Sequence, residues 1–150
     1  MGYKLSQLSR DRLKGVKPQL IEVVERAIQI SEVDFRVTEG VRTLTRQKEL
    51  LKAGSTTTLN SRHLTGDAVD LAPMVGREVR YDWALVYKVA EAMRTAALEL
   101  GVKVRWGGVW DKNLADLKGG LSDDVADYAA RRKAAGKRVF LDGPHFELPV

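Results

Sequence analysis

The sequence predicts an α+β fold in which helices pack on a small, mostly antiparallel sheet. Two observations lead to this class. Residues 17–31 and 83–100 carry apolar side chains at helical spacing, and several short segments between and after them carry the patterns of strands. With 150 residues, of which 44% are hydrophobic, the chain fits a single domain, residues 1–150, and has enough apolar surface to exclude a disordered protein.

The first predicted helix covers residues 17–31, and Pro18 lies near its start, where a missing N–H costs little. Residues 34–39 alternate in polarity and predict a strand that Gly40 closes. The apolar stripe of the helix is made of Leu20, Val23, Val24, Ala27 and Ile28.

A short helix is expected next, over residues 46–53. Thr45 is the expected N-cap, and Gly54 is expected to end the helix. Residues 55–66 have the composition of a loop, and residues 68–72 predict a second strand.

Residues 83–100 predict the longest helix, which Gly101 ends, and residues 102–106 predict a strand after it. The expected buried stripe of the helix is Trp83, Val86, Ala90, Met93 and Ala97. A loop is expected between two glycine pairs, Gly107 with Gly108 and Gly119 with Gly120.

A last helix is expected from a cap at Ser122 to about Ala135, with acidic residues in its first turn and basic ones in its last. Residues 138–141 and 145–148 predict two strands around a turn at residues 142–144.

Composition also excludes several classes of function. The chain has no cysteine, which excludes a disulfide scaffold, a cysteine-based zinc finger and a thiol nucleophile. The net charge of +5 favours an anionic partner: nucleic acid, an acidic membrane surface or an anionic wall polymer. Lys and Arg are spread along the chain and aromatic residues make up 7%, which argues against a nucleic-acid-binding domain, the non-enzyme alternative.

Two short segments carry candidate chemistry, residues 61–70 and residues 142–147. Strand alternation places Asp70 between two alanines, where a carboxylate needs a cation or a hydrogen-bond donor. His63 precedes Asp70 by seven residues, and Gly66 lets the loop turn back between them. In the second segment His145 and Glu147 share one face of the strand.

Two imidazoles and one carboxylate match a catalytic zinc site, which keeps its fourth position open for water. The alternative from spacing alone is a pair of buried histidines with satisfied hydrogen bonds and an ordinary surface aspartate.

The patterns S-x-H-x-x-G-x-A-x-D and D-x-x-H-F-E resemble those of peptidase family M15. These zinc enzymes include D-Ala-D-Ala dipeptidases, D,D-carboxypeptidases and phage L-alanyl-D-glutamate endopeptidases. The segments Gly40-Val41-Arg42-Thr43, Arg46-Gln47 and Arg105-Trp106-Gly107-Gly108 also resemble the family, in the same order, so that the likeness covers about residues 35–148. The sequence departs from the phage enzymes at Val109, where they often have an acidic residue, and residues 111–138 have no assignment.

The resemblance implies the hedgehog or D-Ala-D-Ala-peptidase type of fold and one Zn²⁺ per chain. The implied metal ligands are His63, Asp70 and His145. The implied catalytic residues are Asp142, as the general base, and Arg42, as the group that stabilises the oxyanion. The residues implied to contact substrate are Ser61, Gln47 and Trp106.

Other roles for some of these residues stay open. Glu147 is the rival for the general base, although we expect it to orient a ligand histidine from outside the metal's coordination sphere. Arg42 alternatively forms a surface ion pair, and Ser61 a hydrogen bond within its loop. Trp106 and Trp110 are candidates for a groove wall, with a core position as the alternative for Trp106.

The resemblance further implies a phage endolysin that acts on peptidoglycan stem peptides. The N-terminus, MGYKLSQLSRDRLKG, lacks the apolar segment of a signal peptide. The expected location is therefore the host cytoplasm, until a holin-type permeabilising protein gives access to the periplasm and cell wall. We expect a monomer without nucleic acid or stable membrane association. The alternative enzyme is a cytosolic or wall D-Ala-D-Ala dipeptidase or D,D-carboxypeptidase.

Overall fold

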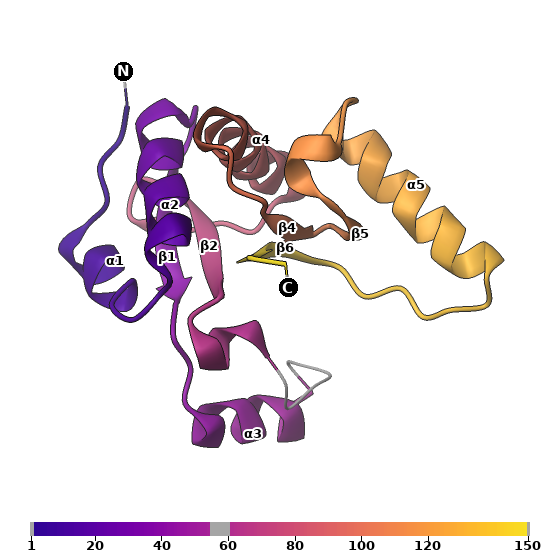
Figure 1. The fold of residues 1–150 in the computed structure, drawn as a ribbon, viewed down its shortest axis with the longest axis horizontal. Coiled ribbons are helices and arrows are strands. Elements are labelled where there is room, and N and C mark those ends of the chain that lie inside the picture. Colours follow the sequence, from indigo (N-terminus) through magenta and orange to yellow (C-terminus); the bar gives the residue numbers. More distant parts are fainter. Residues whose placement is uncertain (1, 55–60, 150) are drawn as a thin grey trace.

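The computed structural model describes residues 2–54 and 61–149, and Figure 1 labels most of its helices and strands. The helices are α1 (Gln7–Arg12), α2 (Pro18–Ile30), α3 (Leu44–Lys52), α4 (Trp83–Leu100) and α5 (Leu121–Ala134), with 3-10 turns η1 (Arg62–Thr65) and η2 (Leu114–Asp116). The strands are β1 (Asp34–Glu39), β2 (Ala68–Val75), β3 (Glu78–Val79), β4 (Arg105–Gly107), β5 (Val109–Asn113) and β6 (Asp142–Glu147).

The strands form one sheet in the order β1-β2-β6-β4-β5, with β3 paired to β2, and every pairing is antiparallel. This architecture confirms the α+β prediction. The last strand, β6, lies between β2 and β4, so the end of the chain is inserted into the middle of the sheet (Figure 1). Side chains from three distant parts of the sequence can therefore meet on one face.

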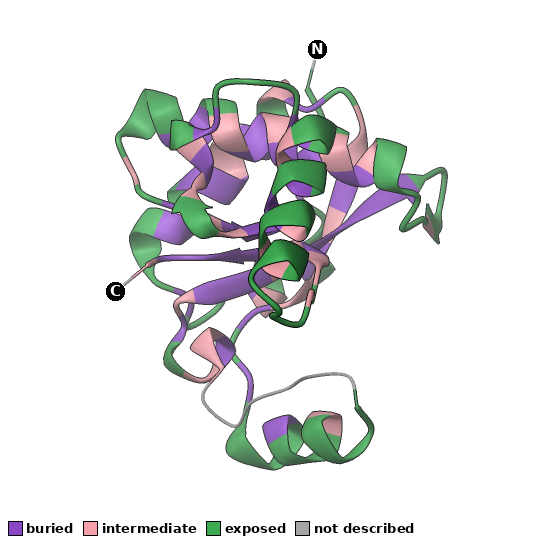
Figure 2. Cartoon of the chain, turned by 90° about the vertical axis from the view of Figure 1, so that its right-hand side faces the viewer, coloured by how far each residue is buried: buried purple, intermediate pink, exposed green. Residues whose placement is uncertain are grey.

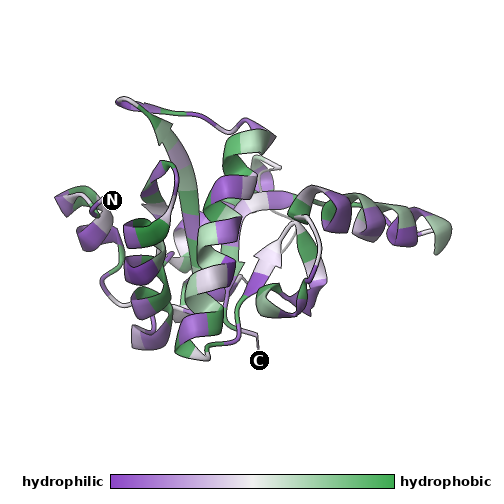
Figure 3. Cartoon of the chain, turned by 90° about the horizontal axis from the view of Figure 1, so that it is seen from above, coloured by the Kyte–Doolittle hydropathy of each residue, from purple (hydrophilic) through white to green (hydrophobic). Residues whose placement is uncertain are grey.

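The hydrophobic core lies on the face of the sheet that packs against α2 and α4. Val69 and Leu71 of β2 and Phe146 of β6 belong to this core, each at most 1% exposed. Strand alternation sends the residues between them to the opposite face. Seen from above, α2 and α4 lie side by side, and α5 extends away from the rest of the chain (Figure 3).

Two helix caps differ from the prediction. The hydroxyl of Thr43, rather than Thr45, accepts the hydrogen bond from the backbone N–H of Arg46, at 3.1 Å, and α3 begins at Leu44. In α5 the N-cap is Gly120 without a side-chain bond, so the expected cap at Ser122 is wrong. Both segments offer several residues suited to a cap, and the backbone direction into the helix selects among them.

The strands in the second half of the chain differ more from the prediction. The strand expected over 102–106 is β4, shortened and shifted to Arg105–Gly107, and the loop expected after it contains β5 and η2. Residues 138–141 are not a strand, and the expected turn at 142–144 is instead the beginning of β6. The cause is a tertiary contact: Asp142 pairs with Gly107 of β4, which keeps the backbone extended through the Gly-Pro pair.

Smaller differences affect the buried face of α4, two missed elements, the length of β2 and the predicted loop. Trp83 is 40% exposed and is not part of the buried stripe of α4, whereas the other four predicted positions are buried. The sequence pattern missed α1 and β3, and β2 runs three residues further than expected. Within the predicted loop 55–66, residues 62–65 form η1, and residues 55–60 lie outside the described residues.

Figure 2 shows α3 as a largely exposed helix beside the main body, with η1 between it and the sheet. In the described part of the chain, no helix combines the length and apolar character needed to cross a bilayer.

Candidate metal centre

Three elements bring His63, Asp70 and His145 together. His63 lies on η1, which begins where the Ser61 hydroxyl accepts from the backbone N–H of His63 and ends at Gly66 in the left-handed conformation, φ 78°. Asp70 of β2 is directly opposite His145 of β6 in the antiparallel register, so both side chains project from the same face.

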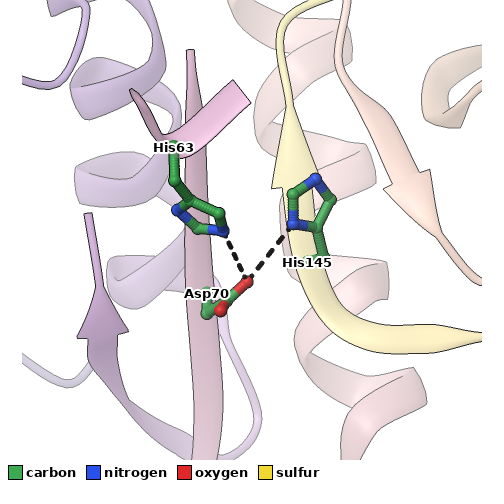
Figure 4. A group of neighbouring side chains, drawn as sticks. All are labelled: His63, Asp70 and His145. Carbon is green, nitrogen blue, oxygen red and sulfur yellow. Dashed lines mark hydrogen bonds and ion pairs between the residues drawn. The ribbon is translucent and has the colours of Figure 1, made fainter. Parts of the chain in front are cut away.

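One oxygen of Asp70 lies between the two imidazoles (Figure 4). Oδ1 is 3.2 Å from Nε2 of His63 and 3.4 Å from Nδ1 of His145. One ligand atom from each of the three residues lies within 4.8 Å of the others, a spacing that could hold a metal ion. The histidines are 1% and 6% exposed, while Asp70 keeps 20% of its side chain accessible.

The outer nitrogen of each imidazole is held by an acceptor. Nδ1–H of His63 donates to the carbonyl of Gly40 at 2.9 Å, and Nε2–H of His145 donates to Oε1 of Glu147 at 2.7 Å. In the neutral imidazoles these partners leave the other ring nitrogen with the lone pair that a metal ion would bind, whereas without a metal that nitrogen can carry a proton and donate to Asp70. Metal-binding histidines in proteins are commonly oriented by such outer hydrogen bonds.

The charge distribution of the centre favours a cation. Burial acts to raise the pKa of Asp70, but hydrogen bonds from His145 and His63 outweigh it and hold that pKa below its usual range. Burial acts to lower the pKa of His145, while hydrogen bonds to Asp70 and Glu147 raise it to about 9. Without a metal the site thus attracts protons, which a bound metal ion would displace.

Arg42 borders the centre and is fixed by a network of its own. Its Nε and Nη2 donate to the two oxygens of Glu39, at 2.7 and 2.6 Å, and its Nη1 donates to Gln47 at 2.6 Å and to Ser61 at 3.5 Å. Nη2 is also 3.8 Å from Oδ2 of Asp70. The guanidinium therefore stands next to the proposed metal position.

Asp142 lies at the start of β6, three residues before His145. Burial raises the pKa of Asp142 and so does the charge of Asp70, whereas His145, His63 and Arg42 act in the opposite direction. The carboxyl is thus within electrostatic reach of the whole centre, although the structure places it on a strand rather than on the expected turn.

The three residues expected to contact substrate lie in different surroundings. Ser61 is half-buried next to Arg42. Gln47 has no exposed surface, and its amide oxygen accepts from Arg42, so it holds the guanidinium in place. Trp106 is also completely buried, and its Nε1–H donates to the carbonyl of Gly143 at 2.6 Å. Its indole therefore occupies a core position, the alternative to a place in the groove wall.

The structure adds an aromatic residue that sequence reasoning missed. Tyr81 is 53% exposed and hydrogen-bonds to Thr38; burial raises its pKa, as do the charges of Asp70 and Asp142. No local pattern marks Tyr81, which precedes α4; its hydrogen bond to Thr38 of β1 accompanies the electrostatic effect of Asp70. Trp110, expected as a groove wall, has its ring 5.1 Å from that of His145.

Three comparisons with known proteins agree with one another. The family model described as phage L-alanyl-D-glutamate peptidase matches residues 1–149. The L-alanyl-D-glutamate peptidase of Escherichia phage T5 is 31% identical over 152 residues, which cover 99% of each chain. The crystal structure of the Serratia marcescens L-Ala D-Glu endopeptidase ChiX is similar with a TM-score of 0.75 and 36% identity, over 99% of this chain and 91% of that one.

Proposed function

The chain belongs to the phage L-alanyl-D-glutamate peptidase family, and on this premise we propose that it is a zinc-dependent peptidoglycan hydrolase of the endolysin type. Its substrate is the stem peptide, and the bond cut joins L-alanine to D-glutamate, the activity named for the relatives from phage T5 and Serratia marcescens. The observation that carries the proposal is the cluster of His63, Asp70 and His145 on one face of the sheet.

The donor set fits zinc. His63 offers Nε2, His145 offers Nδ1 and Asp70 offers a carboxylate oxygen, a combination of nitrogen and oxygen ligands that zinc accepts in catalytic sites. When bound, zinc would supply Lewis-acid chemistry, lowering the pKa of a water and polarising the peptide carbonyl. Gly40 and Glu147 orient the two imidazoles from outside.

We assign the general base to Asp142. Its carboxyl has a pKa raised by burial and by Asp70, as suits a group that must take a proton from water and pass it to the leaving amine. Glu147 is the rival, but its Oε1 accepts from His145 and its Oε2 is 3.8 Å from Nε of Arg62. These contacts support a positioning role for Glu147.

We assign stabilisation of the developing oxyanion to Arg42. Four of its N–H groups can be matched to the hydrogen bonds with Glu39, Gln47 and Ser61, which leaves one on Nη2, the nitrogen nearest Asp70. A rigidly held donor next to the metal costs no reorganisation when charge develops on the carbonyl oxygen.

One sheet and one hydrophobic core support a single catalytic domain over residues 1–150. We propose that this domain acts as a monomer on peptidoglycan, without nucleic acid or stable membrane association. A holin-type permeabilising protein would give it access from the host cytoplasm to the wall.

The deciding experiment is mass analysis of purified peptidoglycan digested by the zinc-loaded protein. New N-terminal D-glutamate identifies the endopeptidase, and the Asp142→Asn variant serves as the matched inactive control. Release of D-alanine without new D-glutamate termini would instead identify a D,D-carboxypeptidase, and an unchanged peptidoglycan would refute hydrolysis altogether.

A further inference from the structure

Two polar side chains next to the metal centre lack partners. Arg105 of β4 and Asn113 of β5 are opposite each other in the sheet. The buried Nε of Arg105 and the buried Oδ1 of Asn113 have no hydrogen-bond partner in the described part of the chain. Both residues keep some exposed surface as a whole, although these two atoms are themselves buried. Buried polar atoms of this kind call for an explanation, because leaving them unpaired costs free energy.

Their position connects them to the centre. Arg105 is directly opposite Glu147 of β6, and Glu147 hydrogen-bonds to His145. Residues opposite one another share a face of the sheet, so Arg105 projects from the same face as His145. The two are diagonal neighbours on adjacent strands, a relation that corresponds to about 7–8 Å between their backbones. In Figure 1, β4 lies beside β6 at the centre of the sheet.

Around Glu147, positive charge is not matched by negative charge. Arg62 approaches Oε2 of Glu147 at 3.8 Å, while Oε1 of the same carboxylate is occupied by His145. Arg105 forms no ion pair with any carboxylate among residues 2–54 and 61–149. The neighbouring carboxylate of Glu147 is therefore engaged by Arg62 and His145, and Arg105 has no counter-ion in the described part of the chain. A partly buried cation in such surroundings is stabilised by a second anion.

We propose that Arg105, with Asn113 beside it, forms a subsite for the free carboxylate of the D-glutamate that follows the bond to be cut. The inference rests on the proposed function. A glutamate residue within a peptide has two carboxyl groups besides its amine, and only one of them continues the chain. The other carries a negative charge close to the scissile carbonyl, and Arg105 is a diagonal neighbour of the metal-ligand candidate His145 on the same face of the sheet. The N–H groups of the Asn113 amide can donate to the same carboxylate, whereas its unpaired Oδ1 is an acceptor and cannot bind it directly.

The test compares two synthetic peptides, N-acetyl-L-alanyl-γ-D-glutamyl-L-lysine and the same peptide with that free carboxylate amidated. The zinc-loaded wild type should cleave the acid with a kcat/KM about 10- to 100-fold higher than the amide, as expected for a charge-assisted contact. In Arg105→Gln this preference should fall to within about threefold. Arg105→Lys should keep part of it, because it retains the charge without the planar fork.

The control is Arg77→Gln, which removes the same charge from an exposed turn between β2 and β3. It should keep the wild-type preference. Zinc content and thermal unfolding are measured for every variant. If Arg105→Gln does not fold, the test uses Arg105→Lys and Asn113→Ala instead. In each of these variants the preference for the acid peptide over the amide should be lower than in the wild type.

An Arg105→Gln variant that keeps the full preference overturns the subsite, and so does a wild type that cleaves acid and amide equally. A wild type that leaves both peptides and whole peptidoglycan uncut overturns the proposed function and the subsite with it. The two failures are therefore distinguishable.

Discussion

Truncation of Arg42 to alanine tests whether the network beside the metal centre stabilises the fold as well as the transition state. The substitution removes four hydrogen bonds from a side chain that is 7% exposed, and it leaves the carboxylate of Glu39 without its bidentate partner. Gln47, which is fully buried, loses its contact with the guanidinium. Arg42→Ala should therefore change stability and not only turnover.

The magnitude follows from the burial of the pair. Removing one member of a buried ion pair costs about 3–5 kcal/mol. Glu39 keeps 24% of its side chain exposed and can recover part of its hydration, which lowers the expected loss to about 2–4 kcal/mol. For a chain of 150 residues this loss corresponds to a decrease in Tm of about 5–15 °C. Arg42→Lys keeps the charge and should lose about half as much.

The assay combines thermal unfolding with kinetics measured well below the Tm of each variant. At a temperature where both proteins are folded, Arg42→Ala should lower kcat by about 10²–10³ with little change in KM. A variant with an unchanged Tm would refute the structural part of the reasoning. A variant in which KM rises while kcat is retained would show that Arg42 binds a substrate carboxylate in the ground state instead.

Four further predictions concern the metal centre and the residues around it. Replacing His63 or His145 with alanine should abolish stoichiometric zinc binding and activity together; zinc retained by the double variant, in metal analysis, would contradict the ligand assignment. Asp142→Asn should keep zinc but lose hydrolysis, and near-normal turnover would transfer the role of base to Glu147. In the zinc-free protein, burial raises the pKa of Asp142, so NMR should find that its carboxyl titrates above the ordinary range for aspartate. Because the folded protein then binds this proton more tightly than the unfolded chain, the protonated carboxyl stabilises the fold at low pH. This contribution to the free energy of unfolding should be lost as pH rises through the pKa of the folded state. Gly40→Ala should weaken zinc binding and lower Tm, because the added carbon would overlap the carbonyl oxygen of Arg12. The backbone would then have to move, and with it the carbonyl of Gly40 that accepts from His63. A variant with the zinc affinity of the wild type would disprove this.

The sequence alone was sufficient for the features that depend on local periodicity. The helix predicted over 83–100 matches α4 in both bounds, and the alternation around Asp70 placed its carboxylate opposite the core. A buried face repeats every 3.6 residues in a helix and every two in a strand, so the pattern can be read without knowing the partner. His63, Asp70 and His145 could be named together because their motifs resemble those of a zinc peptidase family, whereas their spacing alone also allowed two ordinary buried histidines.

Only the tertiary structure decided which segments became neighbours. The pairing of Asp142 with Gly107 converts an expected turn into β6, and the bond from Trp106 to Gly143 places that indole in the core. The hydrogen bond between Tyr81 and Thr38 of β1 likewise depends on the tertiary structure. Such contacts join residues far apart in the chain, and their free energy depends on hydrogen bonds and packing between segments whose local patterns are each compatible with several partners.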